Sequence, residues 1–127
     1  MIAQRTRLEV IAANLANKDT MFDAQGKLNP YRRKEVFFAP GDPGASTEEG
    51  RALGVHVADI QDDPSGLMVK YDPSSPYADK EGRVFLPNVH PVTEQVNAIE
   101  ASRAYEANVV AAEATKSMMA QALRLLA

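Results

Sequence analysis

The segment from Val92 to Ala127 contains neither glycine nor proline, and it constrains the fold of this chain more than any other feature. As one continuous α-helix it would be about 54 Å long, at a rise of 1.5 Å per residue. A compact globule of this chain length has a radius of gyration of only roughly 14 Å. Such a helix must project beyond its own domain, so assembly with other protein surfaces is the first hypothesis.

This predicted helix begins at Pro91, a residue tolerated in the first turn, and Glu94 complements the positive end of the helix dipole. An early apolar stripe consists of Val92, Val96 and Ile99, which we expect to pack on the chain's own middle module. A later stripe is expected to contact neighbouring subunits, and it consists of Val109, Ala112, Met119, Leu123 and Leu126.

Between the two stripes the helix surface carries small alanines around Tyr105, which let neighbouring helices approach closely. Arg103 has two interpretations. It could form surface ion pairs with Glu100 and Glu106, each worth only tenths of a kcal/mol. Alternatively, Arg103, Tyr105 and Asn108 contact another helix, with tyrosine supplying apolar area and a hydroxyl group.

Residues 2–17 predict a second helix, because Leu8, Ile11 and Leu15 recur at spacings of three and four. The pattern ends at Asn17, the first of three residues that favour a helix stop. Asn14 either faces solvent or is buried between helices and fixes their register. A helix with an apolar stripe of only two turns is marginally stable in isolation, so this helix also needs a partner.

The middle of the chain, residues 21–88, contains all seven glycines and most of the prolines. Four short runs predict strands, each bounded by turn-forming residues: 34–39, 54–60, 67–71 and 83–86. In the third run Leu67, Val69 and Tyr71 share one face, as a half-buried strand requires. Residues 40–52 predict a flexible loop with little to bury. We therefore expect a small β-rich module.

Several classes of function are disfavoured. The chain has no cysteine, which excludes disulfides, thiol nucleophiles and cysteine-ligated metals. His56 and His90 lack metal-ligand spacing, and the acidic residues do not fit a calcium loop. Phosphate-loop and nucleophile-elbow motifs are absent. We expect no catalytic, cofactor or metal site, and no small-molecule substrate.

Charge and hydropathy point the same way. Residues 1–35 hold seven basic and four acidic side chains, whereas residues 36–90 hold four and nine. This asymmetry favours contacts between copies or protein partners, and no basic stripe with interleaved aromatic residues indicates nucleic-acid binding. No apolar run reaches the length of roughly 20 residues that spans a bilayer, and no secretory signal is evident. We expect a chain that is not membrane-inserted and carries no cleaved signal peptide.

Three segments resemble bacterial flagellar rod and hook proteins. Residues 3–17 with Thr20 resemble the Asn-x-x-Asn helix end that these proteins share, and residues 101–108 (ASRAYEAN), with Asn88-Val89 and Glu94, resemble their closing helix. Residues 69–89 (VKYDPSSPYADKEGRVFLPNV) are similar to the signature of the proximal rod proteins. Ser74-Ser75 replaces a common Gly-His, and the family carries a further N-terminal segment that we expect to help form the packed inner layer of the rod.

The resemblance implies a structural subunit of the periplasmic flagellar rod, exported by the flagellar type III apparatus. Its partners would be further copies of itself and other proximal and distal rod proteins. We expect an α+β fold in which residues 1–20 and 89–127 form antiparallel, coiled-coil-like helices around the module of residues 21–88. The expected assembly interface also includes Leu8, Ile11, Asn14, Leu15, Asn17, Arg103, Tyr105 and Asn108. The alternative is a soluble coiled-coil adaptor for a single partner.

Overall fold

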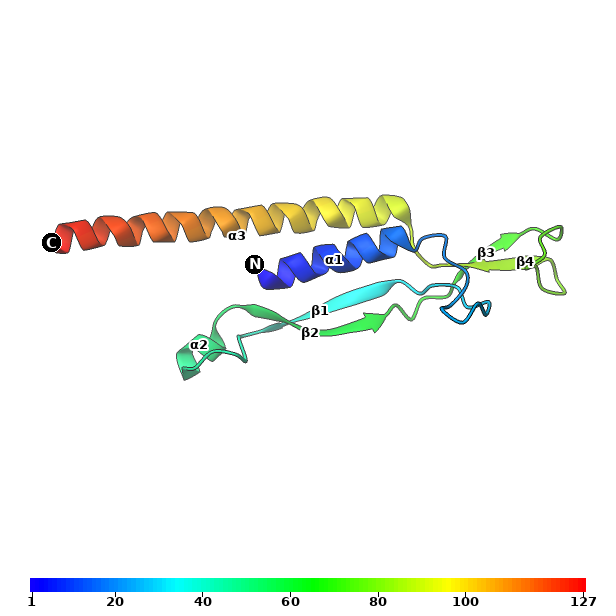
Figure 1. The fold of residues 1–127 in the computed structure, drawn as a ribbon, viewed down its shortest axis with the longest axis horizontal. Coiled ribbons are helices and arrows are strands. Elements are labelled where there is room, and N and C mark those ends of the chain that lie inside the picture. Colours follow the sequence, from blue (N-terminus) through cyan, green and yellow to red (C-terminus); the bar gives the residue numbers. More distant parts are fainter.

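The computed structural model describes residues 1–127 as an α+β fold in which two helices run side by side in opposite directions (Figure 1). One β-hairpin lies along the shorter helix, and a second hairpin extends away from the helix pair (Figure 1). The elements in chain order are α1 (Ile2–Ala16), β1 (Lys34–Pro40), α2 (Glu48–Ala52), β2 (Val55–Asp62), β3 (Met68–Tyr71), β4 (Arg83–Leu86) and α3 (Pro91–Leu126). The prediction of terminal helices around a strand-containing middle is confirmed.

The start of α3 and the end of α1 both follow from local chemistry. α3 is a single helix of 36 residues with proline in its first turn. Proline has no backbone N–H, but N–H groups in the first turn have no acceptor within the helix, so no helical hydrogen bond is lost. α1 ends at Ala16 and is capped by Asn17, whose side-chain Nδ2 donates a hydrogen bond to the Ala13 carbonyl at 2.8 Å. The Thr20 hydroxyl in turn donates to Asn17 Oδ1 at 3.1 Å. These side-chain bonds fix the turn after α1, where the Asn17 backbone N–H also donates to the Ala13 carbonyl at 3.1 Å.

The middle of the chain forms two separate two-stranded antiparallel sheets, β1–β2 and β3–β4, instead of one β-rich module. A bulge between Phe37 and Phe38 interrupts the register of the first pair. The prediction that β3 is half-buried is wrong, because all four of its residues are exposed. A two-stranded ribbon has no second layer of its own, so the alternation in β3 does not by itself bury that strand.

The stretch 40–52 is more structured than predicted, because it contains the short helix α2 and a buried glycine. Gly41 has a φ of +94°, and a Cβ placed there would lie 2.3 Å from the Arg51 carbonyl oxygen. Its N–H donates to the Gly54 carbonyl at 2.8 Å, and its own carbonyl oxygen lies 2.9 Å from His56 Nδ1. Only glycine fits this turn, which ties the end of the hairpin together.

The apolar core is thin. Only 11 of 127 residues are buried, and the buried apolar side chains are mostly small. Ala3, Ile11 and Ala101 are buried on the two helices that pack together, whereas Val84 and Val89 are buried on and after β4. The largest fully enclosed side chains include a glutamate and an asparagine. Polar contacts must therefore contribute much of what holds the elements in place.

A buried polar junction joins α1, α3 and the start of β1. Asn14 of α1 is 1% exposed and Glu94 of α3 is 0% exposed. Asn14 Nδ2 donates to Glu94 Oε2 at 3.2 Å and to the Lys34 carbonyl at 2.9 Å. Asn14 Oδ1 accepts from the Lys34 N–H at 2.9 Å and from the Tyr31 hydroxyl at 3.0 Å. Both donors and both acceptor positions of this amide are thus used.

Arg33 extends the junction to the two hairpins. Its Nε donates to Glu94 Oε1 at 2.6 Å, and its Nη1 donates to Glu35 at 2.7 Å and to Asp63 at 3.2 Å. Its backbone N–H donates to Asn88 Oδ1 at 2.7 Å. Burial alone would lower the pKa of Arg33, but the hydrogen bonds to Glu94 and Glu35 outweigh it and the pKa is raised. The guanidinium therefore remains charged.

Two neighbours have shifted pKa values that suit these roles. Burial raises the pKa of Tyr31, which keeps its hydroxyl a donor to Asn14. The hydroxyl and backbone N–H of Ser65 hold the pKa of Asp63 below its usual range, and Arg33 adds to this effect. Asp63 is therefore ionised at neutral pH and available to the guanidinium.

Glu94→Ala should destabilise the protein by about 3 kcal/mol, because it leaves a partly buried guanidinium and an amide donor without their shared acceptor. The matched control is Glu100→Ala, which removes an exposed carboxylate that lies 3.5 Å from Arg7 and should cost less than about 1 kcal/mol. Urea unfolding followed by circular dichroism measures both. Equal losses would show that the junction is not a special source of stability.

Amide exchange of the dilute protein should divide α3 into two parts. Residues 94–105 contact the rest of the chain and should exchange slowly, whereas residues 110–126 are exposed on all sides and should exchange far faster. Hydrogen exchange with peptide-level mass spectrometry tests this. Uniform protection along the whole helix would contradict it.

Candidate assembly interface

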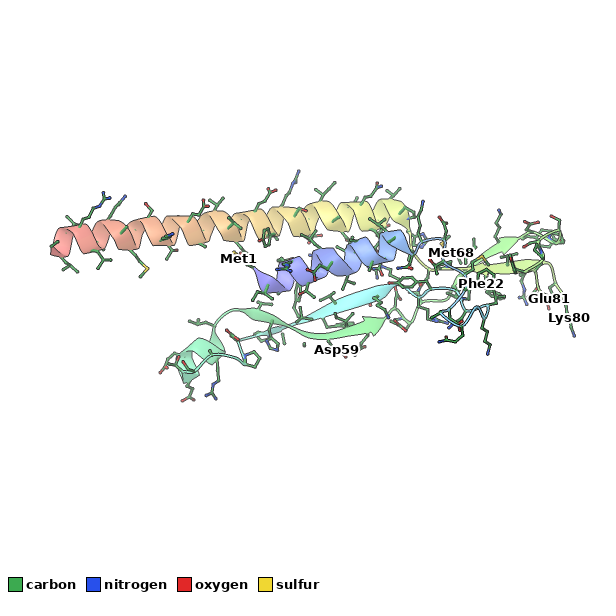
Figure 2. All side chains as sticks on the ribbon, viewed as in Figure 1. Met1, Phe22, Asp59, Met68, Lys80 and Glu81 are labelled. Atoms are coloured by element: carbon green, nitrogen blue, oxygen red, sulfur yellow. The ribbon has the colours of Figure 1, made fainter.

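The C-terminal half of α3 has no cover from the rest of the chain. Beyond Tyr105 only Val109 is half-buried, and every residue from 110 to 127 is exposed. α1 is 15 residues long and α3 is 36, so α1 can accompany less than half of α3. Figure 2 shows Met1 beside the middle of α3, with the remaining turns extending past it.

The later stripe predicted from the sequence lies on this uncovered part. Ala112, Met119, Leu123 and Leu126 are all exposed, with 66% of Leu123 accessible. At 100° per residue these positions continue the helix face that carries Ala101 and Tyr105. The apolar face that begins against α1 therefore continues where α1 is no longer present.

The early stripe does not pack on the chain's own module, and that prediction is wrong. Val92, Val96 and Ile99 are 74%, 58% and 56% exposed and face outward. The face turned toward α1 carries Glu94 and Ala101 instead. Small residues let the helices approach closely and the junction holds the carboxylate, so the larger β-branched residues are left on the opposite side.

The α1 residues that the sequence assigned to the interface fall into two groups, buried and half-buried. Ile11 and Asn14 are buried inside the subunit, so they are not available to a neighbour. Of the two interpretations of Asn14, the structure agrees with the one in which it is buried between helices. Leu8 and Leu15 are half-buried. Asn17 is half-buried and serves as the helix cap. The predicted stripe is mainly the intramolecular face of α1.

The Tyr105 region is also divided. Tyr105 is half-buried, whereas Arg103 and Asn108 are exposed. The surface ion pairs considered for Arg103 do not form, since Glu100 lies 3.5 Å from Arg7 and Arg103 has no carboxylate within 4.0 Å. Arg103 is thus a charged side chain that the subunit itself does not neutralise.

An exposed face that the sequence analysis did not assign lies on the β3–β4 hairpin. Val69 pairs with Phe85 and Tyr71 with Arg83, and paired residues share one face of an antiparallel ribbon. All four side chains are exposed, with the Arg83 guanidinium carbon 5.9 Å from the centroid of the Phe85 ring. The alternation in residues 67–71 indicated a face, but it gave no sign that the Val69–Tyr71 face would be open while Val84 on the other face is buried.

The structure offers little that could bind a metal ion or a small ligand. No three His, Asp or Glu side chains gather closely enough to hold a metal ion, and none of the helices has the length and apolar character needed to cross a membrane. A hollow of about 280 Å³ lies beside the junction and includes Arg7, Val36 and Phe37. Neither of the two main hollows includes His56 or His90.

Comparison with known proteins identifies the group to which this chain is related. Residues 1–21 match the model of the family described as flagella basal body rod protein, and residues 80–125 match that of the flagellar basal body rod FlgEFG protein C-terminal. These two matches cover α1, β4 and nearly all of α3.

Full-length relatives extend the similarity through the hairpins. The flagellar basal-body rod protein FlgC of Buchnera aphidicola subsp. Acyrthosiphon pisum is 42% identical over 125 residues, covering 98% of this chain and 89% of the relative. FlgC of Escherichia coli O157:H7 is 43% identical over 126 residues, with the same coverage. FlgC of Bacillus subtilis strain 168 is 40% identical over 135 residues, covering 98% and 90%. On this similarity, the chain belongs to the FlgC family of flagellar basal-body rod proteins.

Proposed function

We propose that this chain is a non-enzymatic structural subunit of the flagellar basal-body rod that polymerises through its terminal helices. One observation carries the assembly step: α3 extends past α1 with an apolar stripe that nothing in the subunit covers. The similarity to FlgC proteins over nearly the whole chain supports the rod as the place of assembly.

The finer features of this proposal rest on the family. Neighbouring subunits would be further copies and other proximal and distal rod proteins, which would cover α3 in coiled-coil-like packing. The rod would cross the periplasm as a drive shaft and export channel, and the subunit would reach it through the flagellar type III apparatus. The proposed domains are the rod-core helices, residues 1–20 and 89–127, and the middle region of residues 21–88.

Energetics favour many neighbours over one. Burying a leucine or methionine side chain stabilises by about 1.5–3 kcal/mol, whereas association costs an estimated 4–15 kcal/mol or more in lost freedom. The stripe has only a few large side chains, so one helix contact would be weak. Simultaneous contact with several subunits makes assembly cooperative while the dilute subunit remains a monomer.

A soluble coiled-coil adaptor with a single partner would also use an exposed helix. It would not account for the similarity to rod proteins through both hairpins and both helices. The rod subunit is therefore the favoured function.

The double variant Met119→Glu/Leu123→Glu should abolish motility when it replaces the native rod subunit in cells whose own gene is deleted. Two carboxylates on the uncovered stripe would have to be desolvated in the assembled rod. The purified variant should keep its thermal unfolding midpoint within about 3 °C, because an exposed substitution changes stability little.

Gln121→Glu on the opposite side of α3 is the matched control and should leave motility intact. Swimming in soft agar and counts of isolated basal bodies are the measurements. Normal rods built from the double variant would disprove the role of the stripe. Failure of the unsubstituted chain to restore rods would disprove the proposed function itself.

A further inference from the structure

A second stripe lies on the outward face of α3, directly opposite the face that packs on α1. Its residues recur at spacings of four and three: Val92, Val96, Ile99, Arg103, Glu106 and Val110. All six are exposed. Arg103 and Glu106 have no oppositely charged side chain within 4.0 Å, so the pattern combines an apolar surface with two unpaired charges.

A complementary stripe lies on the outward face of α1. It also has spacings of three and four, and it consists of Ile2, Arg5, Glu9, Ala12 and Ala16, all exposed. Arg5 and Glu9 pair only with each other, at 3.0 Å, with both side chains more than half exposed. Such a surface pair is worth less than about 1 kcal/mol, so it can exchange partners at little cost.

The charges select one register when the two stripes are placed antiparallel. If Arg103 lies opposite Glu9, Glu106 lies opposite Arg5, because a step of three on α3 and a step of four on α1 each advance about one helical turn. Ile99 and Val96 then lie over Ala12 and Ala16, so large side chains meet small ones, and Val110 lies over Ile2. Sliding one stripe along the other by one stripe position brings like charges together. In one direction Arg103 lies opposite Arg5, and in the other Glu106 lies opposite Glu9.

We infer that the outward stripe of α3 seats on the outward stripe of α1 in a second copy of this chain. Because α1 and α3 are antiparallel within the subunit (Figure 1), two copies lying side by side in one orientation bring α3 of one antiparallel to α1 of the next. Each α1 would then lie between two α3 helices. The contact joins different surfaces, so it propagates from copy to copy into a ring or helical array.

This inference rests on the proposed function and adds the partner surface and its register. The central charge pairs specify alignment more than they add affinity, since partly buried ion pairs repay little beyond their desolvation. The apolar pairs on either side supply the attraction. This contact uses a face of α3 opposite the C-terminal stripe, so the two can be tested separately.

Charge reversal tests the register in cells that depend on this chain for their rods. Arg103→Glu and Glu9→Arg should each reduce basal bodies per cell by roughly tenfold or more, because like charges then meet between copies. The double variant R103E/E9R should restore the number to within about twofold. The matched control R103E/E113R should not restore it, because Glu113 lies outside the register.

Cysteine cross-linking gives a readout that does not depend on the stability of charge variants. The chain has no cysteine, so Ala12→Cys and Ile99→Cys can be introduced on separate copies that are produced together. Mild oxidation of isolated basal bodies should yield the A12C–I99C heterodimer. The pair A12C and A111C should not, because Ala111 lies off the stripe.

The outcomes separate the inference from the function on which it rests. Rods that contain the chain but yield no A12C–I99C cross-link would overturn the register, as would charge-reversal variants that assemble normally. A cross-link at this pair together with rescue by the double reversal supports it. Failure of the unsubstituted chain to enter rods would instead refute the proposed function.

Discussion

The hydrogen-bonded junction of Asn14, Glu94 and Arg33 is the contact on which the rest of the structure depends. It connects α1, α3, the start of β1, the end of β2 and the segment before α3. Few large apolar side chains are buried elsewhere, so apolar packing alone would leave the relative placement of helices and hairpins poorly determined. Directional bonds to a fully enclosed carboxylate fix that placement, because few other arrangements satisfy all the donors.

The terminal helices were predictable from the sequence because their signals are local. Absence of glycine and proline after Val92, proline at position 91 and the stop at Asn17 each act within a turn or two of the chain. The four strands were found for the same reason, since turn residues bound each run. Local chemistry does not specify which strands share a sheet, so the two separate ribbons and the full exposure of β3 were not foreseen.

The interface was only partly predictable, because apolar spacing shows that a face exists without showing what covers it. Val92, Val96 and Ile99 have the pattern of a core stripe, yet Glu94 and Ala101 have the buried positions. A buried glutamate contradicts the usual preference for apolar residues inside, and only Arg33 and Asn14, distant in sequence, make its burial favourable. The C-terminal stripe is exposed because α1 is too short to accompany it, and its contact with neighbouring subunits stays a prediction.

The bond between Asn14 and Glu94 joins residues 80 positions apart. Each hairpin can form from neighbouring residues, but the helix pair requires both ends of the chain to meet, and non-local closure of this kind is slow relative to local pairing. A partly synthesised chain that lacks Glu94 therefore lacks the contact that fixes the helix pair, and its two-stranded hairpins are marginal in isolation. The order of folding is set by topology: the surfaces that define the subunit come together only after α3 is complete, so incomplete chains lack the geometry that a neighbouring subunit would recognise.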